Sequence, residues 1–376
     1  MKLRAARLTP IAVPMRAALR TTHGTVTDRQ GWLLELEAFG GVPGFGEALP
    51  LPGFGLESAD HAGAALAEAV RRLVGREIDS VAAGLSVVAP DLATAPAARA
   101  ALDGALRDLE ARELGMPLAT RLAAELGTET RPTVASGFLL GSDRPDVAAE
   151  EAAGAVAAGF RVLKLKVGSA AFDRDRDRVA SVRERVGTAV ALRVDANEAW
   201  PESAAAAHIE TLAGLGVELV EQPLDRDATA AAARLRRTSA IPLAADEAVR
   251  DVPSAERVLR AGAADVLVVK PAAVGGLGRA LAIVQRARAA GIEVLITSFL
   301  DTAIGRTGAL HLAAALPPSR HASGLATGAL LADDLASGAA PHAGAIPVPH
   351  DSGLGLVPDR EAMARLARGR PIEVTA

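Results

Sequence analysis

The stretch LKLKVG (163–168) places two lysines, Lys164 and Lys166, in an otherwise apolar run. The chain contains 41 Lys and Arg residues, but only four of them are lysines, the other two being Lys2 and Lys270. Because side chains at positions i and i+2 of a strand point to the same face, Lys164 and Lys166 are predicted to project from one side of a strand. Arginine keeps its proton at physiological pH, whereas a lysine near other cations can release it. This pattern therefore indicates a need for titratable amines.

The same stretch lies in the second of eight short β-branched segments, which begin roughly 25 to 30 residues apart. Ala-rich segments with helical character fill the intervals, for example 147–158, 203–215 and 277–290. Repeated strand–helix units of this length are typical of a parallel α/β barrel. An open doubly wound sheet is the alternative, but the Gly-rich phosphate fingerprint of its nucleotide-binding form is missing. The candidate strands are 133–140, 161–167, 190–196, 217–223, 241–247, 265–271, 292–298 and 320–326.

Residues 1 to about 125 follow a different pattern. Segments 3–13 and 31–40 look like strands, and the Gly- and Pro-rich segment 41–55 is predicted to form loops. Ala/Leu-rich helices follow from residue 58 to about residue 126, with a break around Pro90. Strands followed by helices indicate a small α+β domain ahead of the barrel.

Composition excludes several classes of function. Half of the 376 residues are hydrophobic, which allows a large core, and the net charge of −4 without any basic run argues against nucleic-acid or acidic-membrane partners. The chain has no cysteine, which excludes disulfides and thiolate metal sites. No apolar run approaches the roughly 18 residues of a membrane span. We expect a soluble, cytoplasmic protein with a small-molecule partner; the sequence is compatible with a homo-oligomer without indicating one.

Charged residues stand where five successive candidate strands end. In a parallel barrel these ends meet at one mouth, where the chemistry of such barrels takes place. The residues follow one another at intervals of 29, 26, 25 and 24, so one charge arrives with each strand–helix unit. They are Lys166, Asp195, Glu221, Asp246 and Lys270.

The three acids have a structural and a functional interpretation. Taken singly, Asp195 is a plausible helix cap, Glu221 a turn residue, and Asp246 with Glu247 an ordinary acidic loop. Taken together, three carboxylates at one barrel mouth repel one another unless a cation neutralises them. Oxygen ligands without histidine or cysteine favour Mg²⁺, with Mn²⁺ as a substitute. Asn197, the only asparagine of the chain, follows closely in VDAN.

As a set, these residues resemble the enolase superfamily, specifically its muconate-lactonizing-enzyme-like subgroup. The motifs occur in the order and spacing of that family, and the resemblance covers essentially the whole chain. It implies a modified TIM barrel, (β/α)7β, over residues 126–330, with an N-terminal α+β capping domain over residues 1–125 that segment 331–376 completes. The motifs are K-x-K at 164–166, D-x-N at 195–197, E-Q-P at 221–223, D-E at 246–247 and the lysine at 270.

The resemblance also implies a reaction. A substrate carboxylate binds Mg²⁺ held by the three acids, Lys166 removes the proton α to that carboxylate, and Lys164 lowers the pKa of Lys166 through its charge. Lys270 is then either a second acid/base or a cation over a substrate ring. Arg193, Asn197 and Glu247 are candidates for supporting or substrate-binding roles.

Within the subgroup, the loop at 46–58, Arg193 in RVD, and the runs at 298–316 and 323–334 resemble the o-succinylbenzoate synthases. That resemblance implies Mg²⁺-dependent dehydration of 2-succinyl-6-hydroxy-2,4-cyclohexadiene-1-carboxylate to o-succinylbenzoate, a lyase step of menaquinone biosynthesis. Ser298 and the backbone of Gly324 and Leu325 would then bound the succinyl chain.

Other activities remain open. N-succinylamino acid racemases share the site architecture of the synthases. Dipeptide epimerases carry an acidic D-x-D element at the eighth strand for the substrate's amino group, whereas this chain reads SGLAT there, with no acid before Asp333. A Schiff-base lyase acting through a barrel lysine would leave the three acids without a role. A barrel that only binds a ligand would keep its binding in Lys166→Ala and show no turnover of any candidate acid.

Overall fold

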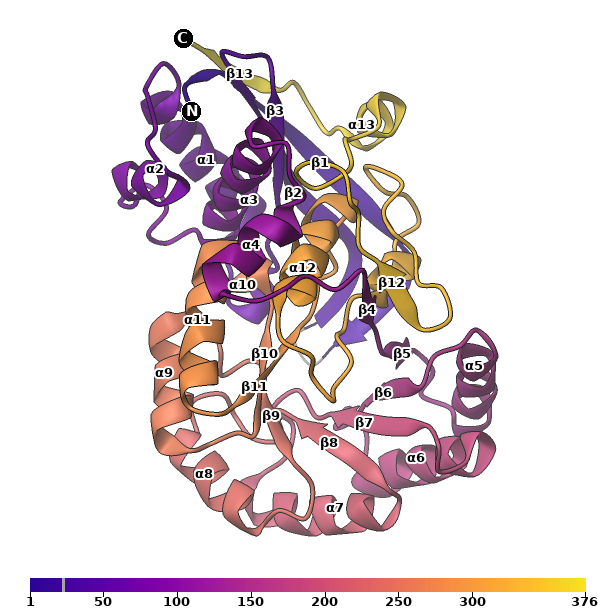
Figure 1. Ribbon diagram of the computed structural model, residues 1–376. Helices are drawn as coiled ribbons and strands as arrows, with labels where there is room; N and C mark the ends of the chain where they lie inside the picture. The colour runs from indigo at the N-terminus through magenta and orange to yellow at the C-terminus, as the bar shows by residue number, and fades with distance from the viewer. Residues whose placement is uncertain (22–23) are drawn as a thin grey trace.

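A curled parallel sheet with its surrounding helices forms one part of the molecule, and an antiparallel sheet packed with helices caps it (Figure 1). The computed structural model describes residues 1–21 and 24–376. The parallel sheet has seven strands in the order β11-β10-β9-β8-β7-β6-β5. They are β5 (Phe138–Leu140), β6 (Val162–Lys166), β7 (Ala191–Asp195), β8 (Val217–Glu221), β9 (Leu243–Ala245), β10 (Val266–Val269) and β11 (Glu293–Ile296).

The predicted eighth strand at 320–326 is reduced to two bridging residues. Ser323 forms a parallel bridge with Ser136, and Gly324 forms one with Thr297 beyond the end of β11. The amide of Gly324 donates to the carbonyl of Ile296 at 3.1 Å, and the amide of Ser323 donates to the carbonyl of Ala135 at 2.9 Å. This short segment joins the two edges of the sheet, so the modified TIM barrel expected from the sequence is the observed architecture.

Helices follow the strands and form the outer ring of the barrel, except α10, a short helix that packs against α3 (Pro96–Glu113) of the cap (Figure 1). Their ends are set by local sequence, as α9 shows: the amide of Ser254 donates to the Asp251 carboxylate, the amide of Asp251 donates to the Ser254 hydroxyl, and Gly262 ends the helix at a φ of 61°. The helices are α5 (Pro145–Ala157), α6 (Phe172–Val186), α7 (Glu202–Gly214), α8 (Thr229–Thr238), α9 (Val252–Ala261), α10 (Pro271–Val274), α11 (Leu277–Ala289) and α12 (Ala303–Ala315).

The cap contains a four-stranded antiparallel sheet in the order β13-β1-β2-β3. Its last strand comes from the C-terminal end of the chain, so the C-terminal segment contributes to the cap sheet, as the family resemblance implied. The strands are β1 (Leu3–Thr21), β2 (Gly24–Ala38), β3 (Pro43–Ala48) and β13 (Ile372–Thr375), and the helices are α1 (Ala59–Leu73), α2 (Val81–Val87), α3 (Pro96–Glu113) and α4 (Leu118–Leu126).

Short elements complete the chain. Strand β4 pairs with β12 in an antiparallel ladder between the start of the barrel and the C-terminal segment. In the described residues, no helix has the length and apolar character needed to cross a membrane. The short elements are η1 (Pro52–Phe54), β4 (Thr133–Ala135), η2 (Ala326–Leu330), β12 (Ala345–Pro347) and α13 (Arg360–Leu366).

The loop prediction for segment 41–55 was wrong for its first half, because residues 43–48 form β3. Here the glycines serve helix packing. A Cβ atom at Gly46 would lie 2.0 Å from the carbonyl oxygen of Ala101, and one at Gly44 would lie 2.3 Å from that of Ala105. The missing side chains let α3 approach the sheet closely, a use of glycine that a single sequence does not distinguish from a turn.

A buried polar cluster, here called the cap–barrel joint, connects β2 and β3 to the loop after β11. It consists of Arg29, Glu47, Asp301 and Thr302. The Arg29 guanidinium donates to the carbonyls of Leu49 and Pro50 in the cap and to those of Phe299 and Leu300 in the barrel. The Glu47 carboxylate accepts hydrogen bonds from the amide (2.9 Å) and the hydroxyl of Thr302. The joint fixes the cap over the carboxyl ends of the strands.

Candidate active site

The two lysines of LKLKVG lie on the inner face of β6. Their neighbours Leu163 and Leu165 are buried in the core between the sheet and its helices, so the alternation of the strand directs Lys164 and Lys166 to the other side. In the sheet register, Lys166 stands beside Asp195 of β7, and Asp195 stands beside Glu221 of β8. The parallel pairing thus places the charged strand ends side by side.

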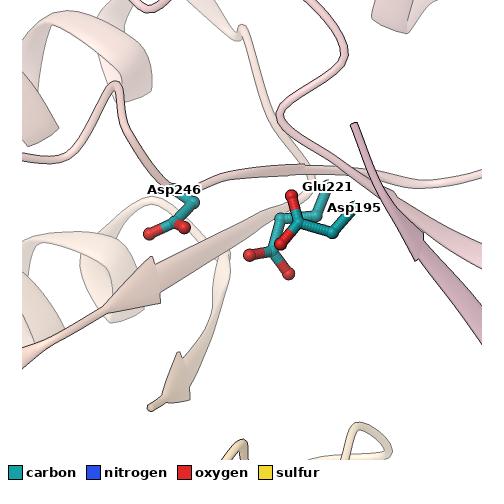
Figure 2. Close-up of side chains that lie close together, drawn as sticks. All are labelled: Asp195, Glu221 and Asp246. Atoms are coloured by element: carbon teal, nitrogen blue, oxygen red, sulfur yellow. The ribbon is translucent and has the colours of Figure 1, made fainter. Parts of the chain in front are cut away.

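Asp195, Glu221 and Asp246 converge at this mouth (Figure 2). The first two end β7 and β8, and Asp246 follows the last residue of β9. One carboxylate oxygen from each residue lies within 4.8 Å of the others, and all three side chains are buried. Buried, converging oxygen donors of net negative charge suit a hard divalent cation such as Mg²⁺. The residues predicted as metal ligands are therefore brought together.

Two lysines neutralise these acids in the structure. The Nζ of Lys164 lies 2.8 Å from both Asp195 Oδ2 and Glu221 Oε1, and the Nζ of Lys270 forms an ion pair with Asp246. Burial alone would lower the pKa of Lys164, but the charges of Asp195 and Glu221 outweigh it and raise that pKa. Burial and the charge of Asp195 raise the pKa of Glu221 to about 8. The positive charges of Lys164 and Lys270 thus offset part of the negative charge of the three acids.

Lys166 has a different partner. Its Nζ donates to Asn197 Oδ1 at 3.0 Å, and Asn197 Nδ2 donates to Glu247 Oε1 at 2.9 Å. Asn197 has a φ of 41°, a left-handed conformation that asparagine tolerates better than most residues. The only asparagine of the chain thus positions the Nζ of Lys166 through a side-chain amide, and within residues 1–21 and 24–376 no carboxylate forms an ion pair with Lys166.

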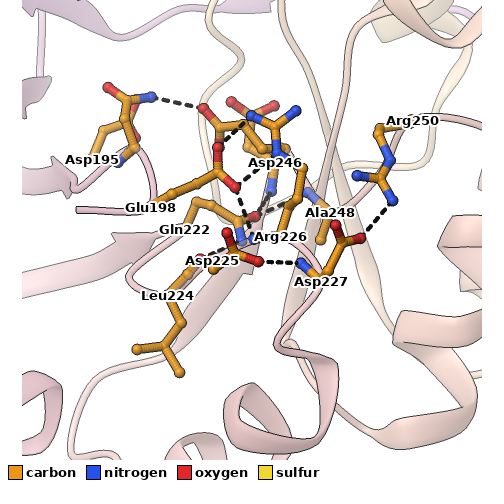
Figure 3. A network of polar contacts seen from close by, with 12 residues as sticks. Asp195, Glu198, Gln222, Leu224, Asp225, Arg226, Asp227, Asp246, Ala248 and Arg250 are labelled. Carbon is orange, nitrogen blue, oxygen red and sulfur yellow. Dashed lines mark hydrogen bonds and ion pairs between the residues drawn. The ribbon is translucent and has the colours of Figure 1, made fainter. Parts of the chain in front are cut away.

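Sequence reasoning gave no role to Gln222, the middle residue of E-Q-P. Its side-chain oxygen accepts hydrogen bonds from the amides of Asp246 (2.9 Å) and Ala248 (3.2 Å), and its Nε2 donates to the carbonyl of Leu224 (Figure 3). Gln222 therefore fixes the loop that carries Asp246. The E-Q-P motif includes Gln222, but the amides that its side-chain oxygen accepts from belong to the neighbouring strand unit, and the register of the sheet brings them there.

Arg193 precedes Asp195 by two residues on β7, so its side chain points to the same inner face of the barrel, and it is buried. Its Nε donates to Glu218 Oε1 at 2.7 Å, and its Nη1 donates to the carbonyl of Ala322 at 2.8 Å. Its bonds connect β7 with β8 and with the segment that replaces the eighth strand. Its predicted role at the substrate stays a prediction.

Ser298, Gly324 and Leu325 meet where the barrel closes. The Ser298 amide donates to the Gly324 carbonyl at 3.1 Å, and its hydroxyl lies 2.6 Å from that of Thr327. These three residues are not among those that line the cavity at the mouth, and their predicted contact with a succinyl chain stays a prediction.

That cavity has a volume of about 280 Å³ and lies between the cap and the barrel. Asp246, Glu247 and Lys270 line it from the barrel, and Phe54 and Leu56 line it from the cap. Phe299 completes this part of the cavity wall. Its ring centroid lies 5.7 Å from the Nζ of Lys270 and 5.5 Å from the ring centroid of Phe54. A small molecule bound here would meet carboxylates, an amine and two aromatic rings.

Comparison with known proteins gives the class to which this fold and site belong. Residues 4–122 match the family described as "Mandelate racemase / muconate lactonizing enzyme, N-terminal domain", and residues 147–362 match "Enolase C-terminal domain-like". The chain therefore belongs to the muconate-lactonizing-enzyme-like subgroup of the enolase superfamily.

Particular relatives are similar over most of the chain. The L-Ala-D/L-Glu epimerase of Bacillus subtilis (strain 168) is 32% identical over 84% of this chain and 85% of its own length. The N-succinyl-L-Arg/Lys racemase of Bacillus cereus (strain ATCC 14579) is 28% identical, covering 83% of this chain and 84% of its own. A crystal structure of a dipeptide epimerase from Enterococcus faecalis V583, complexed with Mg and the dipeptide L-Leu-L-Tyr, has a TM-score of 0.89 at 30% identity, covering 94% of this chain and 99% of that one.

Proposed function

We propose that this protein is a Mg²⁺-dependent racemase or epimerase that inverts the carbon next to the carboxylate of an N-acylated amino acid. The observation that carries the proposal is the placement of Lys166 and Lys270. They come from the end of β6 and the residue after β10, and strands β7, β8 and β9, which bring in the three acids, stand between them. Two amines on opposite sides of one carboxylate site are what inversion by proton transfer requires.

The chain's own residues account for binding. Asp195, Glu221 and Asp246 would hold the metal ion, which, when bound, supplies positive charge for the substrate carboxylate and for the negative charge that develops on it. Lys164, placed between Asp195 and Glu221, adds positive charge at the same end. Phe54, from the cap, covers the cavity and limits access of water to the reacting carbon.

Proton movement follows from the placement of the amines. The unprotonated amine of Lys166 accepts the α-proton from one face, and the protonated amine of Lys270 returns a proton to the other face. The reverse assignment converts the opposite enantiomer. Asn197 keeps the Nζ of Lys166 in place through a neutral side-chain amide.

The partners of the acids near the end of the barrel favour a substrate whose nitrogen is acylated. A free ammonium group would need a carboxylate partner, but the first acid after SGLAT, Asp333, pairs with Arg365, and Asp334 pairs with Arg306. Both carboxylates are engaged by arginines of the protein. An amide nitrogen carries no charge and needs neither of them. The similarity to an N-succinylamino acid racemase supports the same substrate class.

A second candidate is o-succinylbenzoate synthase activity. It uses the same proton abstraction by Lys166, followed by loss of a hydroxyl group that leaves an aromatic ring. The observation that favours it is the wall formed by Lys270 and Phe299, which offers a cation and an aromatic edge to a six-membered ring.

The two candidates separate in one set of assays with Mg²⁺-loaded protein. Proton NMR in D₂O is expected to show exchange of the α-proton and inversion of N-acetyl- or N-succinyl-L-amino acids. Lys166→Met and Lys270→Met are each expected to lose exchange from one enantiomer and retain it from the other, whereas Lys2→Met leaves both unchanged.

Other outcomes contradict the proposal. Negligible exchange together with loss of the ultraviolet absorbance of the cyclohexadiene substrate would assign the synthase reaction instead. Activity that survives EDTA, with borohydride trapping of a substrate adduct, would show Schiff-base chemistry. No turnover of either kind would leave a binding protein.

A further inference from the structure

The cavity at the mouth has a cationic far wall that the proposed reaction does not use. Besides Lys270, its lining includes three arginines, Arg226, Arg250 and Arg279, from the loops and helices that follow β8, β9 and β10. A cavity that accommodates only an apolar side chain or a free ammonium group has no need of guanidinium groups. Their pairing inside the protein decides which of them is available to a ligand.

Two of the three arginines are neutralised by the protein (Figure 3). Arg226 Nε donates to Glu198 Oε1 at 2.8 Å, and a second ion pair joins the same two side chains. Arg250 Nη2 donates to Asp227 Oδ1 at 2.8 Å. Their charges are already compensated, so they contribute less to the attraction of an anion.

Arg279 differs from them. Across residues 1–21 and 24–376, no carboxylate lies within ion-pair distance of its guanidinium group and no hydrogen-bond acceptor is seen for it. Its side chain crosses Gly275, where an added Cβ atom would lie 2.7 Å from Nη1. A second guanidinium, that of Arg99 from α3 of the cap, donates to the carbonyl of Gly275. Burial lowers the pKa of Arg99; the charge of Asp103 opposes this effect, and the charge of Arg279 adds to it.

We propose that Arg279 binds a second carboxylate of the substrate, so that the acyl chain on the amino acid nitrogen ends in an acid, as a succinyl group does. This inference rests on the proposed function, because it takes the reacting carboxylate to lie at the acid triad. One cavity is bounded by Asp246 and Lys270 and also by Arg279, so a single molecule can meet both. A guanidinium binds a carboxylate through two parallel hydrogen bonds, which gives charge and direction together.

The turn at Gly275 and Gly276 places Arg279 close to Lys270 in the sequence and in space. Gly275 and Gly276 adopt φ values of 91° and 112°, which turn the chain between α10 and α11 directly after Lys270. Arg279 lies in the first turn of α11 and packs over this turn. Lys270 and Arg279 are thereby carried by one short, tightly turned segment, which fixes the spacing between the reacting end and the far end of a substrate.

Binding measurements test the proposal with a pair of matched ligands. Isothermal titration calorimetry of the Mg²⁺-loaded protein compares N-succinylglycine with its neutral terminal amide, N-succinamoylglycine. The wild type is expected to bind the diacid at least about tenfold more tightly, a difference of about 1.4 kcal/mol. Arg279→Met should reduce diacid binding to the level of the amide and leave amide binding unchanged, while Arg279→Lys should retain part of the preference.

Arg286→Met is the matched control, because Arg286 is an exposed arginine of the same helix whose partner is Glu256 on the surface. It should leave both affinities unchanged. In turnover, Arg279→Met should raise KM for N-succinyl substrates by at least about tenfold and change kcat by no more than about threefold, because the residue does not contact the reacting atoms.

Three results would overturn the inference. They are equal wild-type affinity for diacid and amide, equal weakening of both ligands by Arg279→Met, and a preference that survives Arg279→Met but disappears in Ser298→Ala. The last would place the distal carboxylate where the barrel closes, as the sequence predicted. If the wild type exchanges no α-proton of any N-acyl amino acid, the proposed function fails, whereas the comparison of the two ligands still decides the role of Arg279.

Discussion

The barrel mouth and the cap–barrel joint are both buried and charged, but they satisfy their charges differently. At the mouth, Lys164 pairs with one oxygen of Asp195 and one of Glu221, two of the residues that would hold a metal ion. In the joint, Arg29 donates to four carbonyls, and Glu47 has its hydrogen bonds from Thr302. The carboxylate oxygens at the mouth can bind a ligand, whereas the polar groups of the joint hold the cap and the barrel together. The difference shows how one chain can separate binding from stability.

The largest expected effect is at the mouth. Glu221→Gln should reduce turnover by at least about 100-fold, because loss of a carboxylate ligand removes several kcal/mol of metal-dependent stabilisation. In EDTA the same variant should be at least as stable as the wild type, because burial and the charge of Asp195 disfavour the ionised form of Glu221 and raise its pKa to about 8. Activity assays and thermal unfolding in EDTA measure the two effects.

The exposed Glu210 of α7 provides the control for this change, and Glu210→Gln should alter neither quantity. A large loss of stability in Glu221→Gln without metal would break the contrast, since it would show that the mouth also holds the fold together.

The next effect is at the joint. Arg29→Met should lower the free energy of unfolding by about 3 kcal/mol or more, because buried carbonyls from both cap and barrel lose their donor. Affinity for Mg²⁺ at the mouth, measured by calorimetry at a temperature where the variant is folded, should remain close to that of the wild type. Urea unfolding gives the stability.

Arg4→Met is the comparison for Arg29→Met, because Arg4 forms an exposed ion pair with Glu37. Such a surface pair contributes at most about 1 kcal/mol. A similar loss of stability in both variants would contradict the role given to the joint.

The smallest effect is a pH dependence of the joint. Burial and the neighbouring charge of Asp301 raise the pKa of Glu47 from 4.5 to about 8. The folded state therefore binds this proton more tightly than the unfolded state, so the contribution of Glu47 is full below pH 4.5 and is lost as the pH rises to about 8. Glu47→Gln should become more stable relative to the wild type across this interval, as measured by thermal unfolding from pH 5 to pH 8.5.

The exposed Glu68 of α1 serves as its control, and Glu68→Gln should keep a constant difference from the wild type over the same pH range. If the difference between Glu47→Gln and the wild type is also constant, Glu47 does not bind a proton on folding, which would contradict the raised pKa of Glu47.

Much of the mouth was predictable because strand alternation and parallel pairing are local rules. The repeat of the strand–helix units identified the barrel, and the strand ends predicted that Lys166, Asp195, Glu221, Asp246 and Lys270 are neighbours. The register sets Lys166 beside Asp195 and Asp195 beside Glu221, and an ion pair joins Lys270 to Asp246. The joint was not predictable, because Arg29 and Leu300 are 271 residues apart in sequence. Nothing in the local pattern around either residue indicates the other.

The sequence by itself determined the class of fold and the set of residues at the mouth, since periodicity directs side chains to one face and the family motifs name the acids and lysines. The tertiary structure decided which of these groups already have partners. Arg193 donates to Glu218, and Gln222 accepts a hydrogen bond from the amide of Asp246. Arg279 has no carboxylate partner among the described residues. Hydrogen bonds and charges depend on distances of a few ångströms between segments far apart in the chain, and only packing sets those distances.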